Sequence, residues 1–190
     1  KEPNWEGRDR IIWSAGHKAP ALYLGLAFAG FYPRKDVVTL RKLYSPYQGH
    51  PHWLKLPGVE VSSGSLGQGL SVAVGVALAG KLNGKDYNTF CIMGDGEQQE
   101  GNIWEAAMEA AHYKLENLIA IVDSNRLQID GPVAEVMNID PLAAKYRAFG
   151  WEVLRINGHD MGAIVEALET AKEGLGKPVE SVTVSASTPG

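Results

Sequence analysis

Short apolar segments alternate with longer amphipathic ones through the second half of the chain, and this alternation constrains the fold more than any other feature. The apolar segments predict strands at residues 89–93, 118–123, 152–156 and 179–184. Between them, apolar residues recur at helical spacing over residues 102–113, 141–149 and 161–173. Strands that alternate with helices pair in parallel, and helices then cover both faces of the sheet. We therefore predict an α/β fold with one parallel β-sheet and helices on both of its faces.

The first half of the chain predicts three helices and one long loop. Apolar residues recur at helical spacing over residues 19–31, and Pro20 stands near the expected start, where its missing N–H costs little. A shorter helix is predicted at 36–44, and a buried one, rich in Gly, Ala, Val and Leu, at 66–82. Residues 45–57 hold three prolines and two histidines and predict an irregular loop. Loops of that length inside compact domains are usually functional or mobile.

Composition predicts one globular domain. The chain has 190 residues, of which 45% are apolar, and no internal repeat, linker or break in composition divides residues 1–190. Its 18 basic and 22 acidic residues give a net charge of −4 without a block of Lys or Arg. That balance argues against a nucleic-acid or membrane-surface partner, because both attract basic patches.

Cysteine use and hydropathy point to a cytoplasmic protein. Cys91 is the single cysteine and stands in an apolar segment, so we expect a reduced, buried thiol. The longest run of small apolar residues, 72–80, is about half a membrane span, and the charged start of the chain is no signal peptide. The chain begins at Lys1 rather than at a methionine, which is consistent with residues missing upstream.

Polar residues follow two neighbouring predicted strands at the point where each strand ends. One strand runs into Gly94-Asp95-Gly96, and the next runs towards Asn125. In open parallel sheets, ligands bind beyond the carboxyl ends of the strands. A carboxylate and an amide oxygen suit Mg²⁺, whose other positions water and phosphate oxygens can fill.

The glycines of this segment favour an anionic ligand. They let the backbone approach closely, and Gly96 lies just ahead of a predicted helix, where free N–H groups attract a diphosphate. We therefore predict a metal-bridged diphosphate at this edge. The alternative is an ordinary strand-to-helix turn, because Gly-Asp-Gly also occurs by chance.

The spacing of these groups resembles a cofactor motif. Twenty-eight residues lie between Gly96 and Asn125, and the segment resembles the thiamin-diphosphate motif, which begins with Gly-Asp-Gly and ends in Asn. The surrounding blocks resemble those of transketolase, in the same order along the chain. They are Ser14-Ala15-Gly16-His17, Gly49-His50-Pro51, Pro57-Gly58-Val59-Glu60, Gly64-Ser65-Leu66-Gly67-Gln68-Gly69, Gly94-Asp95-Gly96-Glu97-Gln98-Gln99-Glu100-Gly101, Trp104-Glu105-Ala106, Asn117-Leu118-Ile119-Ala120-Ile121, Ile129-Asp130-Gly131, Gly150-Trp151-Glu152-Val153 and Asn157-Gly158-His159-Asp160.

The resemblance covers residues 4–178 and is closest to the N-terminal subunit of two-subunit transketolases, a thiamin-diphosphate-binding module of the diphosphate type. It implies that Mg²⁺ or Ca²⁺ is held by the side chains of Asp95 and Asn125 and by the backbone carbonyl of Leu127. Gly94 and Gly96 would line the diphosphate, with the Gly96 N–H facing it.

Four further residues match the family's cofactor pocket and substrate channel. Gly64 and Leu66 would meet the thiazolium and aminopyrimidine rings of thiamin diphosphate. His17 and His50 match histidines that contact the donor sugar, a task that suits imidazole because it donates, accepts or relays a proton near neutral pH. The alternative is that each is an ordinary loop histidine. His52 forms a His-x-His pair with His50 that would suggest zinc, but no cysteine or third ligand is evident.

Two glutamates match a carboxylate network at the family's dimer interface, where it links two active sites. Glu100 and Glu105 occupy these positions, and carboxylates so close together would share protons. We count Glu100 among the catalytic candidates. The alternative is a pair of acids favoured by the macrodipole at a helix start.

The resemblance implies ketol transfer within the pentose phosphate pathway, in which a two-carbon unit passes from a ketose phosphate to an aldose phosphate. Thiamin diphosphate supplies the carbanion chemistry, and the protein orients it. In this family an activating glutamate comes from a pyrimidine-binding domain, which this sequence does not contain. We therefore expect half of an active site, completed by a C-terminal transketolase subunit in a heterotetramer or a homodimer-like contact. The sequence names neither the sugars nor the partner.

Departures from the family pattern support a second hypothesis. The family has one histidine upstream of Asn4 and another beyond residue 178 that find no match here, so we expect family segments to be lacking at both ends. In addition, Arg126 stands directly beside Asn125. The second hypothesis is a catalytically incompetent homologue or fragment that serves in interaction or regulation, and the retained Asp95 and Asn125 argue against it.

Two other enzyme classes fit the sequence less well. A dinucleotide-binding loop at residues 64–75 fails because its glycines do not give G-x-G-x-x-G and no strand clearly precedes them. A deoxyxylulose-phosphate synthase shares the cofactor motif, but the blocks around His17 and His50 favour transketolase.

Overall fold

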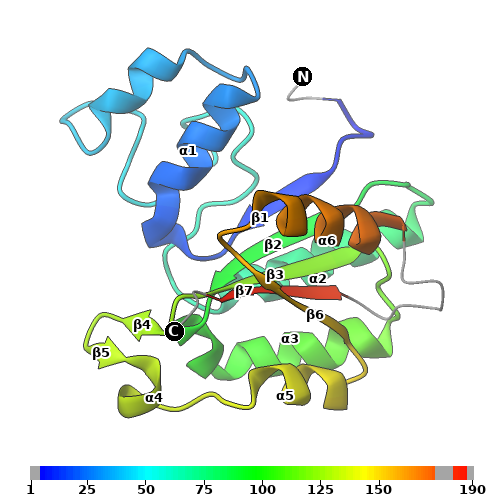
Figure 1. The fold of residues 1–190 in the computed structure, drawn as a ribbon. Coiled ribbons are helices and arrows are strands. Elements are labelled where there is room, and N and C mark those ends of the chain that lie inside the picture. The colour runs from blue at the N-terminus through cyan, green and yellow to red at the C-terminus, as the bar shows by residue number, and fades with distance from the viewer. Residues whose placement is uncertain (1–4, 174–181, 188–190) are drawn as a thin grey trace.

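A five-stranded parallel sheet forms the centre of the computed structural model, which describes residues 5–173 and 182–187. The strand order is β1 (Arg10–Trp13), β2 (Thr89–Gly94), β3 (Leu118–Ser124), β7 (Val182–Ser187) and β6 (Glu152–Asn157). Every neighbouring pair is parallel. The predicted α/β class with a parallel sheet is confirmed (Figure 1).

The register of the strands brings their carboxyl ends to one edge. Gly94 at the end of β2 is opposite Asp123 on β3, and Ser124 is opposite Ser187 on β7. Figure 1 shows that α1 and the short β4 and β5 strands stand beyond this same edge. Residues that directly follow the strands therefore share one region of the surface.

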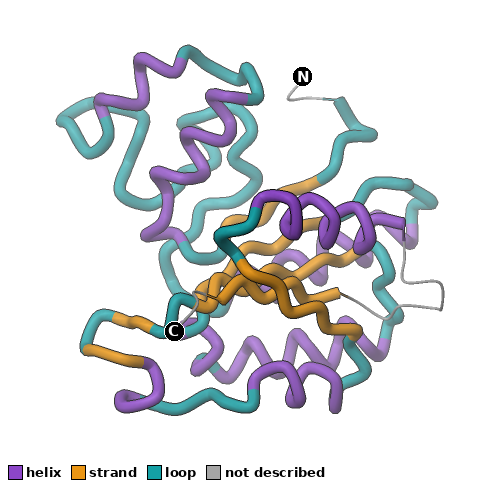
Figure 2. The backbone as a smooth tube through the Cα atoms, in the orientation of Figure 1, coloured by secondary structure: helices purple, strands orange, loops and turns teal. Residues whose placement is uncertain are grey.

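Helices cover both faces of the sheet, as predicted. On one face, α2 (Gln68–Leu82), α3 (Gly101–His112) and α5 (Leu142–Ala148) enclose the main hydrophobic core with residues such as Met93 and Leu118. On the other face, α6 (Met161–Glu173) buries Ala167 and Ala171 against Ile119. Figure 2 shows the strands as one layer between these helices.

The small residues of α2 allow it to approach the sheet closely. A Cβ atom on Gly69 would lie 2.3 Å from the Oγ atom of Ser14, at the end of β1, and one on Gly80 would lie 2.9 Å from the Tyr87 ring. Ala73 and Ala77 are fully buried on the same helix. A larger side chain at Gly69 would therefore push α2 away from the strand ends.

The N-terminal elements form a second hydrophobic cluster. It contains α1 (Ala19–Phe28) and the 3₁₀ segment η2 (Arg34–Thr39), with Tyr23 and Tyr47 in edge-to-face contact at 5.5 Å between ring centroids. The Tyr23 hydroxyl donates to the carbonyl of Gln48 at 2.9 Å. The irregular loop predicted at 45–57 is thus fastened to α1 by packing and by this hydrogen bond.

Several element predictions need correction. Residues 36–44 are not an α-helix: the 3₁₀ segment η2 ends at Thr39, because Leu40 turns to an extended ψ of 127° and Arg41 has a φ of +59°. Helix α1 ends at Phe28 rather than at residue 31, and Gly30, with a φ of +91°, takes the chain out of the helix. The last strand is shifted to Val182–Ser187, and residues 179–181 of its predicted range lie outside the described residues.

Three short strands and one short α-helix have no counterpart in the sequence-based prediction. Strand β1 has four residues, and its pairing with β2 defines it. Strands β4 (Leu127–Gln128) and β5 (Gly131–Pro132) form a small antiparallel pair after β3, and α4 (Val133–Val136) follows directly. Such short segments carry too few residues for a periodic pattern. Among the helices of the described ranges, none is both long and apolar enough to cross a membrane.

Candidate functional site

Asp95 is a buried carboxylate at the carboxyl end of β2, with 3% of its surface exposed. It caps the 3₁₀ segment η3 (Gly96–Gln99), and its Oδ1 atom accepts a hydrogen bond from the Gly96 N–H at 2.9 Å. Its Oδ2 atom accepts one from the Arg126 N–H at 2.5 Å. Burial raises the pKa of Asp95, while these backbone donors and the nearby Lys18 oppose the rise.

The loop after β3 carries the other two predicted metal ligands. The Oδ1 atom of Asn125 accepts from the Leu127 N–H at 2.9 Å, and Arg126 between them has a φ of +63°. This left-handed turn aims the Arg126 N–H at Asp95. The structure therefore brings the segment 125–127 directly against Asp95, as the sequence predicts.

The oxygen donors at this edge suit a hard cation that takes further ligands from water or phosphate. They comprise one carboxylate, one amide oxygen and one backbone carbonyl, from Asp95, Asn125 and Leu127. Across the described ranges 5–173 and 182–187, no group of three or more His, Cys, Asp or Glu residues is placed to hold a metal ion. Mg²⁺ prefers six oxygen ligands, so water and phosphate oxygens must complete its shell here. The donor set thus fits a metal–diphosphate pair.

Gly94 and Gly96 flank Asp95 at the predicted position. Gly94 is buried at the end of β2, and its N–H donates to Glu97. The N–H of Gly96 donates to Asp95 in this structure, so a diphosphate beside it would share that donor. A Cβ on Gly96 would lie 3.0 Å from the Oε1 atom of Gln128, so a larger residue there would require the Gln128 side chain to shift.

Glu97 is a second buried carboxylate, and it joins three elements beneath the site. Its Oε1 atom accepts from the Gly67 N–H at 2.8 Å and from the Ser14 hydroxyl, and its Oε2 atom accepts from the Gly94 N–H at 3.0 Å. The Ser14 Oγ atom in turn accepts from the Gly69 N–H at 3.1 Å. Glu97 therefore fixes the ends of β1 and β2 to the start of α2.

His17 and His50 lie in one cluster with Gly64. A Cβ on Gly64 would be 3.2 Å from Cγ of His50, and one on Gly16 would be 2.7 Å from the backbone nitrogen of Gly64. Both histidine side chains are exposed. The cluster brings together segments that lie far apart in the sequence, as the family motifs imply.

The environment of His17 keeps its imidazole neutral. Burial lowers the pKa of His17 below its ordinary value of 6.5, Lys18 and His50 lower it further, and Glu97 opposes them. At pH 7 the neutral form of the ring therefore predominates, and it can accept a proton at one nitrogen.

We expect an NMR titration of the imidazole protons to place the pKa of His17 below 6.5. Because the unfolded chain binds this proton more tightly, the contribution of His17 to stability falls as the pH drops through 6.5. Replacing Lys18 with methionine removes a cation and is expected to raise the pKa of His17. A pKa of 6.5 or higher in the unsubstituted protein would contradict this account.

The remaining predicted site residues lie at two helices. Leu66 precedes α2, Glu100 is the N-cap of α3, and Glu105 lies within α3. Leu66 is half-buried just before α2, and the side chain of Glu100 lies close to Gly67, where an added Cβ would be 2.6 Å from that of Glu100. Glu100 and Glu105 are both exposed. Glu105 lies beyond the first turn of α3, so the helix-start alternative applies to Glu100 alone.

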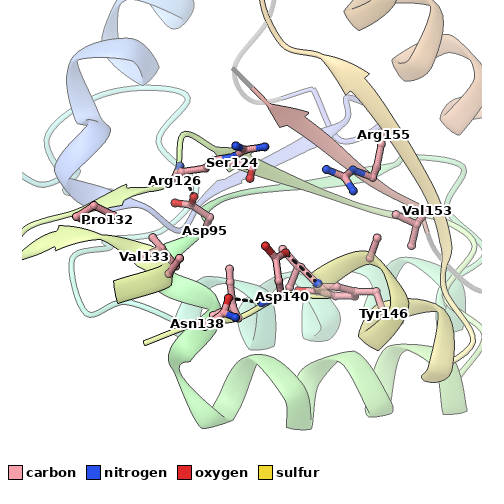
Figure 3. Close-up of a pocket in the computed structure, with 14 residues that line it drawn as sticks. Asp95, Ser124, Arg126, Pro132, Val133, Asn138, Asp140, Tyr146, Val153 and Arg155 are labelled. Atoms are coloured by element: carbon pink, nitrogen blue, oxygen red, sulfur yellow. Dashed lines mark hydrogen bonds between the residues drawn. The ribbon is translucent and has the colours of Figure 1, made fainter. Parts of the chain in front are cut away.

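A cavity of about 330 Å³ adjoins Asp95. Ser124 and Arg126 line it from the end of β3, and Arg155 of β6 points its guanidinium group towards it (Figure 3). Tyr146 forms part of the opposite wall and donates to Oε1 of Gln98 at 2.6 Å. The carboxyl edge is thus hollowed next to the predicted metal ligand.

Nearly the whole chain matches one protein family. The family model described as "Transketolase, thiamine diphosphate binding domain" covers residues 1–186. The chain belongs to the transketolase family.

Two curated transketolase relatives are subunits of larger enzymes. An apulose-4-phosphate transketolase subunit of Phocaeicola vulgatus is 46% identical over 177 residues, which cover 93% of this chain and 63% of the relative. The 6-deoxy-6-sulfo-D-fructose transketolase subunit SqwG of a Clostridium species is 45% identical over 176 residues, which cover 93% of this chain and 64% of the relative. The chain therefore spans just under two thirds of the length of these relatives and matches their N-terminal part.

The fold is that of solved transketolases. The crystal structure of transketolase from Campylobacter jejuni has a TM-score of 0.88 and 39% sequence identity, over 98% of this chain and 30% of that one. Transketolase from Leishmania mexicana has the same TM-score at 34% identity, over 97% of this chain and 29% of that one.

Two residues at the candidate site were missed by the sequence-based prediction. Glu97 belongs to the conspicuous block that contains Gly-Asp-Gly, but two of its three partners, Ser14 and Gly67, come from distant segments. Lys18 directly follows the motif histidine, and its ammonium group reaches Asp123 across the strand ends. Proximity to a motif was the one signal in the sequence for both.

Proposed function

We propose that this chain is the diphosphate-binding part of a two-subunit transketolase. With a C-terminal subunit that carries the pyrimidine-binding domain, it would transfer a two-carbon ketol unit from a ketose phosphate to an aldose phosphate. The names of two relatives as transketolase subunits support the need for a partner. The single observation that carries the proposal is the hydrogen bond from the Arg126 N–H to the Asp95 carboxylate, which joins the loop 125–127 to Asp95.

The proposed cofactors are thiamin diphosphate and Mg²⁺, for which Ca²⁺ could substitute. When bound, thiamin diphosphate supplies the carbanion chemistry of the reaction. Asp95, Asn125 and the Leu127 carbonyl would hold the metal beside the diphosphate. Gly64 and Leu66 would contact the rings, and Gly64 packs against His50.

In this proposal, the exposed His17 and His50 contact the substrate. His17 is neutral at pH 7 because its pKa is lowered, so it can accept a proton from a sugar hydroxyl and return it. His50 packs over Gly64 beside it and can donate to the same substrate. The exposed Glu100 and Glu105 are accessible to a partner subunit, consistent with a heterotetramer or a homodimer-like contact. The single thiol, Cys91, is buried and unpaired, which supports a reducing, cytoplasmic setting.

A transfer assay tests the proposed reaction. The protein, purified together with the subunit it assembles with, is given a ketose phosphate and an aldose phosphate, and the lengthened ketose is measured. We expect activity that requires both subunits, thiamin diphosphate and Mg²⁺. Replacing His50 with asparagine is expected to lower kcat/KM by roughly 10²- to 10⁴-fold, the usual contribution of a proton-transfer residue. A complex that binds the cofactor without transferring the ketol unit would support the hypothesis of an interaction subunit.

A further inference from the structure

Lys18 places a positive charge at the carboxyl edge of the sheet. It follows His17 in the 3₁₀ segment η1 (Gly16–Lys18), and its Nζ atom forms an ion pair with Oδ2 of Asp123, at the end of β3. A Cβ built on Gly94, at the end of β2, would lie 3.7 Å from the same Nζ atom. The ammonium group therefore lies between the ends of β2 and β3, where the diphosphate is proposed to bind.

The electrostatic influence of Lys18 extends over the site. Asp95 and Asp123 bring two carboxylates to this edge, and Lys18 offsets part of their repulsion towards an incoming anion. Without it, the edge would repel a diphosphate more strongly.

The Lys18 ammonium group can exchange its partner Asp123 for a ligand. The Asp123 side chain is 47% exposed and that of Lys18 is 23% exposed. Ion pairs at such accessible positions are weak, whereas an ammonium group binds phosphate oxygens through strong charge-assisted hydrogen bonds. A diphosphate held at Asp95 could therefore draw Lys18 away from Asp123.

We propose that Lys18 binds a phosphate group of the diphosphate, and that Asp123 holds the ammonium group in position until the ligand arrives. This inference rests on the proposed function. It differs from a purely structural role for the ion pair, because it predicts weaker ligand binding when Lys18 is lost but not when Asp123 is lost.

Calorimetric titration of the purified protein, alone and together with the subunit it assembles with, tests the inference; the ligands are inorganic diphosphate and thiamin diphosphate, each with Mg²⁺. We expect Lys18→Met to weaken binding of both ligands by about 10- to 100-fold, as for a lost charge-assisted hydrogen bond. Lys18→Arg is expected to retain most of the affinity. Asp123→Asn is expected to leave binding unchanged or tighter, because it releases Lys18 to the ligand. Lys85→Met is the matched control, since Lys85 pairs with Glu6 ahead of β2, at the opposite edge.

The outcomes separate this inference from the proposed function. Equal affinities for Lys18→Met and the unsubstituted protein, with unchanged melting temperatures, would overturn the role of Lys18. An equal weakening by Lys18→Met and Asp123→Asn would also overturn it and would show a structural ion pair. If the protein binds inorganic diphosphate in a Lys18-dependent way but does not bind thiamin diphosphate, the proposed function fails while the role of Lys18 stands. Binding of neither ligand would refute both.

Discussion

Replacing Asp95 with alanine is expected to abolish metal-dependent binding of thiamin diphosphate, with a loss of at least 100-fold in affinity, or about 2.7 kcal/mol. Asp95 is the buried carboxylate of the proposed ligand set, and its oxygens also accept the N–H groups of Gly96 and Arg126. The substitution therefore removes a metal ligand and releases the loop that carries Asn125. Equilibrium dialysis against thiamin diphosphate, with and without Mg²⁺, measures the effect.

Two further variants keep this prediction falsifiable. Asp95→Asn preserves the size of the side chain, so a loss of binding there reflects the missing charge rather than a collapsed loop. Asp86→Asn is the control, because Asp86 is exposed ahead of β2, at the opposite end of the strand. Retention of metal-dependent affinity by both Asp95 variants would show that the metal binds elsewhere.

Replacing Glu97 with alanine is expected to destabilise the protein by about 3–5 kcal/mol, because it leaves two buried backbone donors unpaired at about 1–3 kcal/mol each and opens a cavity. These donors are the N–H groups of Gly67 and Gly94, and the Ser14 hydroxyl loses the same partner. For a chain of this length, the melting temperature should fall by roughly 6–20 °C. Urea denaturation measures the change in the free energy of unfolding.

A conservative variant and a surface variant serve as controls for the stability of Glu97→Ala. Glu97→Gln keeps one acceptor oxygen, so we expect it to cost less than Glu97→Ala. Glu109→Ala removes an exposed carboxylate from the same helical region and is expected to change the free energy of unfolding by less than about 0.5 kcal/mol. A Glu97→Ala variant as stable as Glu109→Ala would show that Glu97 does not hold β1, β2 and α2 together.

The sequence predicted the start of three strands. Strands β2, β3 and β6 begin at the predicted residues 89, 118 and 152. For β2 and β3, which lie inside the sheet, burial on both faces requires an apolar run with a clear start, whereas β6 lies at the edge and leaves Glu152 and Arg155 exposed. Strand β1 escaped prediction because its four residues, which begin with Arg10, become a strand through pairing with β2. Its identity depends on a partner some eighty residues away, as the register of Arg10 with Thr89 shows.

The candidate site was predictable where topology alone decides the geometry. Asp95 and Asn125 follow adjacent parallel strands, so their approach follows from the sheet edge that they share. The roles of Glu97 and Lys18 could not be predicted, because their partners Ser14 and Asp123 lie 83 and 105 residues away in the chain. Such contacts require the positions of whole elements, which no local pattern contains.

The most direct test of the central claim is a calorimetric titration of the unsubstituted protein with thiamin diphosphate, in the presence of Mg²⁺ and again after its removal by a chelator. The protein is measured alone and together with the subunit it assembles with. We predict saturable binding that disappears when the metal is removed and returns when Mg²⁺ is restored. Binding of equal strength without any divalent cation, or no binding by the folded protein even with its partner, would contradict a metal–diphosphate site at Asp95 and Asn125.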